Sequence, residues 1–492
     1  MSQSAASAKP SDTKKITWYT LAFMAFSTVW GFGNVVNGFG YFNGIQAIFS
    51  WIMIFVLYFV PYSLMVGELG SAFKNAGGGV TSWVLETTNP KLAYYAGFTY
   101  WVVHIPYIAS KGSGGLKALA WTFLQNQWYD NIPSKYIQLA TAVVFVFFLW
   151  VAAQGMTTLK ALTSLAGSSM FIMSLLFILM MFAAPAINPS ASYVPLDWSW
   201  KTLIPTFDVK YFTSLSILVF AVGGCEKISP YVNKVEDPGK DFPKGMIALA
   251  IMVMVCAILG TVAMGMMFSG AEITGANQDH FIANGQYEAF QRLGEYYHMG
   301  NALVVIYGAC NTIGQFSTLV LSIDAPLRML LDDQNARQFV PKALLKQNKH
   351  GAYINGIYLI GILSGAIILI QTMGKDASSI ITWLTKLNSV CMPLRYLWVF
   401  FAYIMLRKAG DKFHSDYVFV KNNNLAITLG VWCFLVTALC CAGGIIVFGN
   451  AGVDWGQTIM NALTPVVLLA LGMIMPAIRK REDEKEAAET AK

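Results

Sequence analysis

The sequence predicts an all-α protein that crosses a membrane many times, and three observations support this fold class. Of the 492 residues, 56% are hydrophobic and only 12% are charged, whereas soluble domains carry about 25% charged residues. Twelve apolar stretches reach the length of about 20 residues that a helix needs to cross the hydrocarbon core. Two of these stretches, the first and the sixth, are interrupted near their centres by glycines.

The order of the spans predicts where the two termini lie. We place the spans at 17–44, 45–73, 93–125, 137–154, 159–185, 208–230, 245–270, 299–331, 353–373, 377–407, 423–448 and 457–479. An even number of spans puts both termini on one side. Most Lys and Arg residues lie in the tails and loops on that side. The loops on the opposite side hold only Lys135, Lys201, Lys210, Arg292 and Lys375. Positive loops stay cytoplasmic, so we expect a multi-pass protein of the cell membrane with both termini inside.

Two further segments follow from this orientation. The acidic stretch 270–298 becomes an external loop, and the mixed-charge tail REDEKEAAETAK becomes a frayed or loosely helical cytoplasmic end. The net charge of +7 is spread over many short loops, without the single basic face that nucleic acid requires. We therefore expect a lipid bilayer and no nucleic acid as partners.

Other classes of protein lack their sequence signals here. All seven cysteines lie in apolar stretches without metal-ligand spacing, so we expect no metal site. HExxH, GxSxG and P-loop motifs are absent from the sequence, which argues against an enzyme or a bound cofactor. Pore loops and repeated charged rings, which are typical of channels, are also missing.

The two interrupted spans point to transport. The first contains Trp30, Gly31, Phe32, Gly33 and Asn34. The sixth contains Phe220, Ala221, Val222, Gly223 and Gly224, followed by Glu226. Broken helices persist in lipid only where they line a cavity, and matching breaks in two halves of a chain mark a substrate site of a secondary transporter. The alternative is that these glycines only let helices pack closely.

Broken helices suit a zwitterion. The start of a half-helix offers free N–H groups and a positive dipole end, and its end offers free carbonyls. Together the two breaks can hold an α-carboxylate and an α-ammonium group. Glycine lets the ligand approach the main chain. We therefore expect an amino acid or its decarboxylated amine as the substrate.

Three motifs resemble one family of transporters. They are GELGSAFKNAGGGVTSWVLE at the end of span two, FAVGGCEKISPYVNKVEDPGKDFPKG in span six, and SIDAPLRMLLDDQNARQFVPKALLKQNKHGAYIN after span eight. They resemble the corresponding motifs of the amino acid–polyamine–organocation (APC) superfamily, and the bacterial branch near the glutamate/GABA-type antiporters in particular. The resemblance covers at least residues 17–410.

The resemblance implies a fold and a division of the chain. It implies twelve transmembrane helices with a LeuT-like five-plus-five inverted repeat, in which helices 1 and 6 are broken. The chain would divide into an N-terminal tail (1–16), a ten-helix core (17–407), a cytoplasmic loop (408–422), the peripheral helices 11 and 12 (423–479) and a C-terminal tail (480–492).

The resemblance also implies roles for the residues at the breaks. The amides of Gly31 and Gly33 would bind the substrate carboxylate. Carbonyls near Trp30 and over the stretch from Phe220 through Ala221 and Val222 to Gly223 would take the ammonium group. Phe220 would be an aromatic gate, and Glu226 a gating or protonation residue.

Some positions depart from the family pattern. The G-S-G of span one is G-F-G here, so Phe32 is expected to narrow or reshape the pocket, and Asn75 replaces an aromatic residue or proline. Ser168 stands where many proton-coupled relatives carry a lysine, which favours exchange. A proton-coupled symporter and a non-transporting amino acid sensor remain alternatives, and the sequence leaves a homo-oligomer open.

Charged residues inside spans also need an explanation, because each costs about 3 kcal/mol on insertion scales. We expect Lys111 either to face the pocket, where it would favour an acidic or polar substrate, or to pair with Asp324 or Glu226. Glu226, Asp324 and His104 are candidates for gating or proton-linked roles, since burial favours a neutral carboxyl group and histidine titrates near neutral pH. The remaining charges, Lys117, Lys386 and Arg395, are expected to serve packing or gating.

Overall fold

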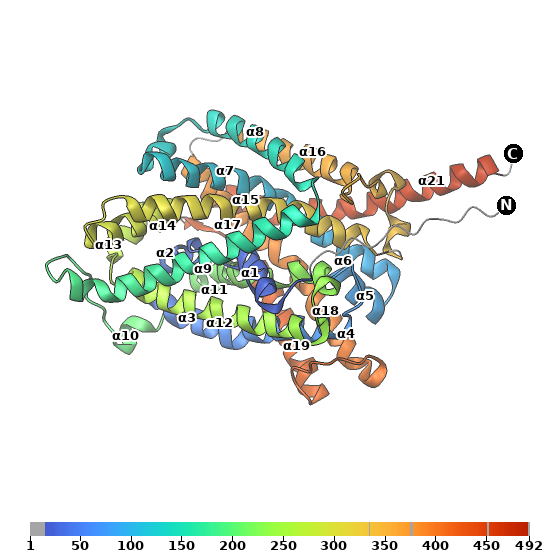
Figure 1. Cartoon of the computed structure of the whole chain (residues 1–492), viewed down its shortest axis with the longest axis horizontal. Coiled ribbons are helices and arrows are strands. Elements are labelled where there is room, and N and C mark those ends of the chain that lie inside the picture. Colours follow the sequence, from blue (N-terminus) through green and yellow to red (C-terminus); the bar gives the residue numbers. More distant parts are fainter. Residues whose placement is uncertain (1–14, 334, 374–376, 450–451, 491–492) are drawn as a thin grey trace.

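The computed structural model describes residues 15–333, 335–373, 377–449 and 452–490. These residues form a bundle of long helices whose axes lie mainly along the long axis of the molecule (Figure 1). The first half contains α1 (Trp18–Val29), α2 (Gly33–Tyr41), α3 (Ala47–Ile54), α4 (Val60–Ala72), α5 (Val80–Thr87), α6 (Pro90–Val102), α7 (His104–Leu124), α8 (Ser134–Ala152), α9 (Met156–Ile187), α10 (Trp200–Leu203) and α11 (Val209–Val222). The second half contains α12 (Pro238–Gly265), α13 (Gly270–Ile273), α14 (Gln278–Tyr296), α15 (Ala302–Leu331), α16 (Ile354–Ile370), α17 (Ala377–Cys391), α18 (Tyr396–Lys408), α19 (Asn423–Gly444), α20 (Trp455–Ala470), α21 (Ile474–Thr490) and the two short strands β1 (Phe448–Gly449) and β2 (Gly452–Val453).

Nine helical runs of the described chain are long and apolar enough to cross a membrane. They are Gly44–Ala72, Ser134–Ala152, Lys160–Ile187, Val209–Lys234, Pro238–Gly265, Ala302–Leu331, Trp383–Lys408, Asn423–Gly444 and Trp455–Thr490. The pair α1 and α2 makes a tenth if the two bent helices count as one span. These runs establish a polytopic all-α membrane protein.

Both interruptions predicted from the glycines are present. Helix α1 stops at Val29, Trp30 is extended, and α2 starts at Gly33 with its axis turned by 42°. Helix α11 stops at Val222, and the chain continues beyond Gly223 and Gly224 as a 3₁₀ helix, η4 (Cys225–Lys234). The second break therefore changes the type of helix, with Gly224 at a φ of +116°, a conformation that favours glycine.

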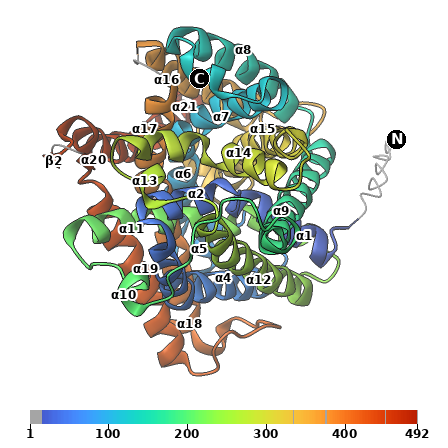
Figure 2. The ribbon, with the colours of Figure 1, turned by 90° about the vertical axis from the view of Figure 1, so that its left-hand side faces the viewer.

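Close packing holds α1 in the middle of the bundle. Helix α1 packs against α9 and α12, and α7 packs against α15. A side chain at Gly167 on α9 would overlap the carbonyl of Phe23 on α1, so glycine is needed for this approach. Seen along the long axis of the molecule, α2, α14, α15 and α7 lie near one another (Figure 2). These elements surround the candidate site.

Glu68, from the motif of span two, joins three elements on the side of α4 and α18. Its carboxylate pairs with Arg407 at 2.7 Å and accepts a hydrogen bond from the backbone N–H of Phe419 at 2.9 Å. The side chains of Glu68 and Arg407 are both buried. The Glu68–Arg407 pair therefore fixes the loop after α18 against α4, which gives this motif residue a structural role outside the cavity.

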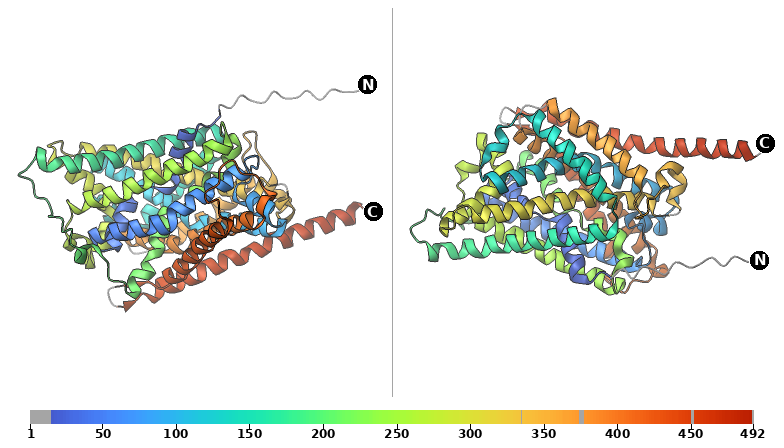
Figure 3. Two further views of the ribbon diagram at one scale, coloured as in Figure 1. Left: turned by 90° about the horizontal axis from the view of Figure 1, so that it is seen from below. Right: turned by 45° about the horizontal axis from the view of Figure 1, so that its top comes forward.

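Two segments differ from their sequence-based descriptions. Residues 270–298, expected as a loop, form α13 and the 19-residue amphipathic helix α14, whose buried face includes Phe281, Tyr287 and Phe290. The charged tail is helical as far as Thr490 and projects from the end of the bundle opposite α13 and α14 (Figure 3). An ion pair between Lys342 and Asp483 at 3.5 Å contributes to its position.

Candidate functional site

A cavity of about 210 Å³ lies at the two breaks. Its walls come from the α1–α2 break, α7, the α11–η4 break, α14, α15, α17 and the 3₁₀ turn before α18. Seven predicted site residues line it: Trp30, Gly31, Gly33, Lys111, Phe220, Ala221 and Gly223. Five others do not: Phe32, Val222, Glu226, Asp324 and His104. The structure thus brings most of the predicted binding residues around one space and places the predicted gating residues outside it.

The first break faces the cavity with its backbone. A side chain at Gly31 would meet no atom within 4 Å, so this residue borders open space. The first hydrogen bonds of the second half-helix run from the Asn34 N–H to the Gly31 carbonyl and from the Val35 N–H to the Phe32 carbonyl. The preceding amides have no acceptor inside the helix, as at any helix start. Such a helix start carries a partial positive charge that favours an anion.

Asn34 connects the two breaks. Its side-chain amide donates to the carbonyl of Val29 at 3.2 Å and to the carbonyl of Ala221 at 3.1 Å. The Thr28 hydroxyl makes a second connection, to the carbonyl of Gly224 at 3.0 Å. Some carbonyls that a substrate ammonium was expected to use are therefore occupied by the protein itself.

Glycine is needed at position 223 because Tyr396 packs directly against it. A side chain at Gly223 would overlap the Tyr396 hydroxyl, and both residues line the cavity. Phe220 also reaches the cavity and contacts Tyr107 edge-on, with ring centroids 6.1 Å apart. Aromatic side chains from α7, α11 and α18 thus form one wall.

Glu226 lies behind this wall in a dry cluster of donors. Its carboxylate accepts hydrogen bonds from the Tyr62 and Tyr100 hydroxyls and pairs with Arg395 at 3.0 Å. All four side chains are buried. The carboxylate is thus held by two hydrogen bonds and one ion pair, all from side chains. Glu226 therefore joins side chains of α4, α6 and the turn before α18.

His104 belongs to the same cluster. Its Nδ1–H donates to the Tyr100 carbonyl at 2.6 Å, and its Nε2 accepts from Arg395 at 2.5 Å. Both ring nitrogens are therefore used in the neutral form, and a second proton would face a guanidinium group. We call Glu226, Arg395, His104, Tyr62 and Tyr100 the inner cluster. Of its members, Arg395 lines the cavity.

Two lysines approach one tyrosine ring in the cavity wall. The Lys111 ammonium lies 4.9 Å and the Lys227 ammonium 5.3 Å from the ring centroid of Tyr107. Lys111 also donates to the side chain of Gln315 at 3.2 Å. Among the described residues, neither lysine has a carboxylate within 4.0 Å of its Nζ atom, so the predicted pairing of Lys111 with Asp324 or Glu226 is not present.

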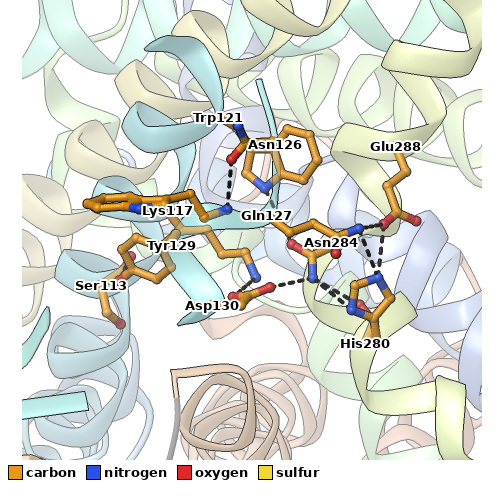
Figure 4. A network of polar contacts seen from close by, with 11 residues as sticks. Ser113, Lys117, Trp121, Asn126, Gln127, Tyr129, Asp130, His280, Asn284 and Glu288 are labelled. Atoms are coloured by element: carbon orange, nitrogen blue, oxygen red, sulfur yellow. Dashed lines mark hydrogen bonds and ion pairs between the residues drawn. The ribbon is translucent and has the colours of Figure 1, made fainter. Parts of the chain in front are cut away.

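A second ion-pair cluster lies farther along α7 (Figure 4). Lys117 pairs with Asp130 at 2.9 Å, and Asp130 accepts from Asn284 on α14 at 2.7 Å. Asn284 also accepts from the Trp121 indole at 3.3 Å. His280 and Gln127 both reach Glu288, at 2.9 and 2.7 Å. We call the set formed by Lys117, Asp130, Asn284, His280, Glu288, Gln127 and Trp121 the outer cluster.

Phe32 and Asp324 are placed away from the cavity. The Phe32 ring lies in an aromatic group with Phe177, Phe290 and Tyr307, at centroid distances of 4.7, 5.2 and 5.9 Å. It therefore packs behind the break, and the expectation that its ring narrows the pocket is corrected. Asp324 pairs with Arg328 at 2.7 Å, one turn away on α15.

Sequence reasoning missed two contributors to the cavity. Lys227 follows Glu226 directly and was not among the predicted site residues, although an intramembrane cation is itself a signal. The face of α14 that supplies Ala283, Gln286 and Tyr287 was read as a loop. The helical spacing of its apolar residues was the available signal.

Comparisons with known proteins place the chain in a family. The model of the amino acid permease family matches residues 16–470. The chain belongs to the amino acid permease family. It is 48% identical over 484 residues to the aspartate/glutamate permease AcaP of Lactococcus lactis subsp. cremoris, with 96% of this chain and 97% of that protein covered. The APC resemblance is thereby confirmed.

Two distant relatives from Lactococcus lactis subsp. lactis are antiporters. The probable agmatine/putrescine antiporter AguD is 22% identical over 374 residues, with 74% of each chain covered. The glutamate/gamma-aminobutyrate antiporter is 23% identical over 376 residues, with 74% of this chain and 70% of that protein covered. This amino acid permease is therefore a multi-pass secondary transporter, not an enzyme, as the broken spans predict.

Proposed function

We propose that this permease exchanges acidic amino acids across the cell membrane by alternating access. One observation carries the proposal: four cationic side chains line the cavity, Lys111, Lys117, Lys227 and Arg395, while its described lining contains no Asp or Glu. Lys117 and Arg395 have carboxylate partners, and Lys111 and Lys227 have none among the residues that the structure describes. The positive surplus favours a substrate with a net negative charge. The name of AcaP, an aspartate/glutamate permease, supports the same substrates.

The main-chain groups of the substrate would bind at the breaks. The amides of Gly31 and Gly33 would hold the α-carboxylate, and carbonyls near Trp30 and between Phe220 and Gly223 the ammonium group. Phe220, at the edge of Tyr107, would close over the ligand. The bond from Asn34 to Ala221 narrows the choice of carbonyls to those that Asn34 does not occupy.

Twelve spans in a five-plus-five inverted repeat are part of the proposal. The described chain supplies nine membrane-length runs and the bent α1–α2 pair. The shorter apolar helix Ile354–Ile370 would be the ninth span. Helices α6 and α7, which meet at Val103, would form the third, and α7 contributes Ser110, Lys111, Ser113 and Lys117 to the cavity wall. The distribution of Lys and Arg then puts both termini in the cytoplasm.

Exchange is favoured over proton-coupled symport by two contacts. Ser168, at the position of the coupling lysine in many relatives, only donates to the carbonyl of Leu165 on its own helix, at 3.1 Å. Glu226 is held by Arg395 and two tyrosines and does not line the cavity. The antiporters among its relatives fit this mode.

Counterflow into proteoliposomes tests the proposal. Vesicles loaded with aspartate, asparagine or putrescine are given labelled glutamate outside. Aspartate-loaded vesicles should accumulate label, asparagine-loaded vesicles much less, and putrescine-loaded vesicles no more than empty ones. Equal uptake by empty vesicles under an inward proton gradient would indicate symport. Ligand-induced stabilisation in a thermal melt without any flux would indicate a sensor.

The role of Lys111 has its own variant. Lys111→Met removes one of the two cations without a carboxylate partner, and we expect it to weaken glutamate and aspartate transport more than that of asparagine. Transport of the same substrates with unchanged affinity would remove Lys111 from the binding site. Lys244→Met is the matched control, because Lys244 lies on the exposed side of α12 and pairs with Asp241.

A further inference from the structure

Lys227 is a buried cation whose position is set by the second break. The positive φ of Gly224 turns the chain out of α11, and the N–H of Lys227 closes the first turn of η4 by donating to the Gly224 carbonyl at 3.0 Å. Only 1% of the residue is exposed, yet it lines the cavity. Its charge is therefore hidden from solvent and directed at the place where a substrate would bind.

The contacts of Lys227 leave its charge without a counter-ion. Its ammonium donates to the Ser322 hydroxyl on α15 at 2.6 Å, and that hydroxyl donates in turn to the Thr318 carbonyl. The Tyr107 ring supplies a cation–π contact. An ammonium has three donors, and no carboxylate of the described residues lies within 4.0 Å of its Nζ atom. Its neighbour Glu226 is already paired with Arg395.

Buried cations normally have a partner, and two other cations of the cavity wall, Lys117 and Arg395, show this. Lys117 has Asp130, and Arg395 has Glu226. Lys111, which lacks a carboxylate, is only half-buried and can reach water. A dry ammonium without an anion is unfavourable, and a ligand carboxylate would supply what the protein leaves out. Lys227 thus differs from every other cation of the wall.

Lys227 lies close in the chain to a direct contact between the two breaks. Gly224, three residues earlier, accepts from Thr28, which lies next to the end of α1. The Tyr107 ring places Lys111 near the same part of the cavity. We propose that Lys227 binds the side-chain carboxylate of an acidic amino acid whose α-carboxylate lies at the first break. This inference rests on the proposed function and adds the residue that selects the side chain.

Binding to the purified full-length permease tests this assignment, with aspartate and asparagine as probes of equal shape. Lys227→Met should weaken aspartate binding by on the order of 100-fold, the range of a charge-assisted hydrogen bond, and change asparagine binding only a few-fold. Lys227→Arg should keep the preference for aspartate. Lys244→Met, an exposed charge removal, should bind both as the wild type does.

Other outcomes separate the inference from the function it rests on. Equal loss of aspartate and asparagine binding in Lys227→Met, or no loss at all, overturns the assignment while wild-type selectivity still supports acidic substrates. Wild-type protein that binds asparagine as well as aspartate overturns the proposed function itself. If Lys227→Met does not fold, Lys227→Gln, which can still donate to Ser322, provides the same measurement and the same criteria.

Discussion

The inner and outer clusters both contribute a paired cation to the cavity wall, but their surroundings differ. Glu226 and Arg395 are dry, and their pair is surrounded by Tyr62, Tyr100 and His104. Lys117 is equally buried, yet its partner Asp130 keeps 15% of its side chain exposed, and the contacts continue to His280 on the surface. Because the inner cluster is buried and the outer cluster reaches water, we expect the cavity wall to stay fixed at the inner cluster and to separate at the outer cluster.

The elements that carry the two clusters agree with this difference. The inner cluster joins α4, α6, α7, η4 and the turn before α18, which are parts of the packed bundle. The outer cluster joins the end of α7 and the 3₁₀ turn η3 (Gln127–Asn131) to α14, a helix outside the membrane-length runs. Separation of η3 from α14 would open the cavity on that side.

The largest effect is expected from breaking the inner pair. Arg395→Met leaves Glu226 buried without its cation and should destabilise the protein by about 3–5 kcal/mol, seen as a lower melting temperature of the purified protein. Adding Glu226→Gln should restore most of that loss, because no charge is then left unpaired. A melting temperature of Arg395→Met equal to that of the wild type would contradict this account.

The variant Glu226→Gln on its own tests proton coupling, since an unaltered pH profile of uptake would argue against it.

A smaller effect is expected from the same change in the outer pair. Lys117→Met leaves Asp130 without a cation, but Asp130 can reach water and keeps its bond from Asn284. We expect a loss of about 1–2 kcal/mol, measured in the same melting experiment. A loss as large as that of Arg395→Met would show that the outer cluster is as dry as the inner one.

Weakening the contact between η3 and α14 should change transport more than stability. Asn284→Ala removes the bonds to Asp130 and Trp121. We expect exchange to change by about three- to tenfold, with a melting temperature close to that of the wild type, since a lost hydrogen bond contributes about 1 kcal/mol. The readout is the initial rate of counterflow over a range of substrate concentrations. Unchanged kinetics would separate α14 from access to the cavity.

The smallest effect is a pH dependence from His280. The hydrogen bond to Glu288 raises the pKa of His280 above its ordinary value, and the nearby Asp130 acts in the same direction while Lys117 opposes it. The stabilisation is complete below about pH 6.5, the ordinary histidine pKa, and is lost as pH rises through the raised pKa. Because the pair is half-exposed, its contribution is small.

The corresponding variant is His280→Gln. In proteoliposomes with external pH varied from 6 to 8, we expect wild-type exchange to increase with pH by less than about threefold, because Glu288, which holds Gln127 of η3, loses its ion pair with His280 on the same helix. His280→Gln should flatten that increase, and Glu288→Gln should flatten it as well. A wild-type rate that falls over this range would reverse the proposed sign.

Much of the fold and part of the site could be predicted from the sequence because their signals are local. Gly31, Gly33, Gly223 and Gly224 indicate the breaks, and of these four Gly224 adopts the positive φ that few other residues tolerate. Glu226 and Arg395 were identified as intramembrane charges, but their pairing joins residues far apart in sequence, which no spacing reveals. Asp324 is the opposite case, because its partner Arg328 lies four residues away on the same helix, a spacing that can be read from the sequence.

Two errors have distinct physical causes. Phe32 lies inside the first break, so its ring was expected in the pocket, but a one-residue shift along a turning backbone changes the direction of a side chain. The ring instead joins Phe177 and Phe290. Helix α14 was read as a loop because its charged residues lowered its hydrophobicity, although one of its faces is apolar.

Asn34 couples the two helix interruptions to each other. One carboxamide group holds the ends of both half-helices, through the carbonyls of Val29 and Ala221. Any tilt that parts α1 from α11 must release at least one of these bonds, and a slight tilt gains nothing in return. Reorientation of the site should therefore proceed in one concerted step, without a stable halfway state in which only one helix has moved.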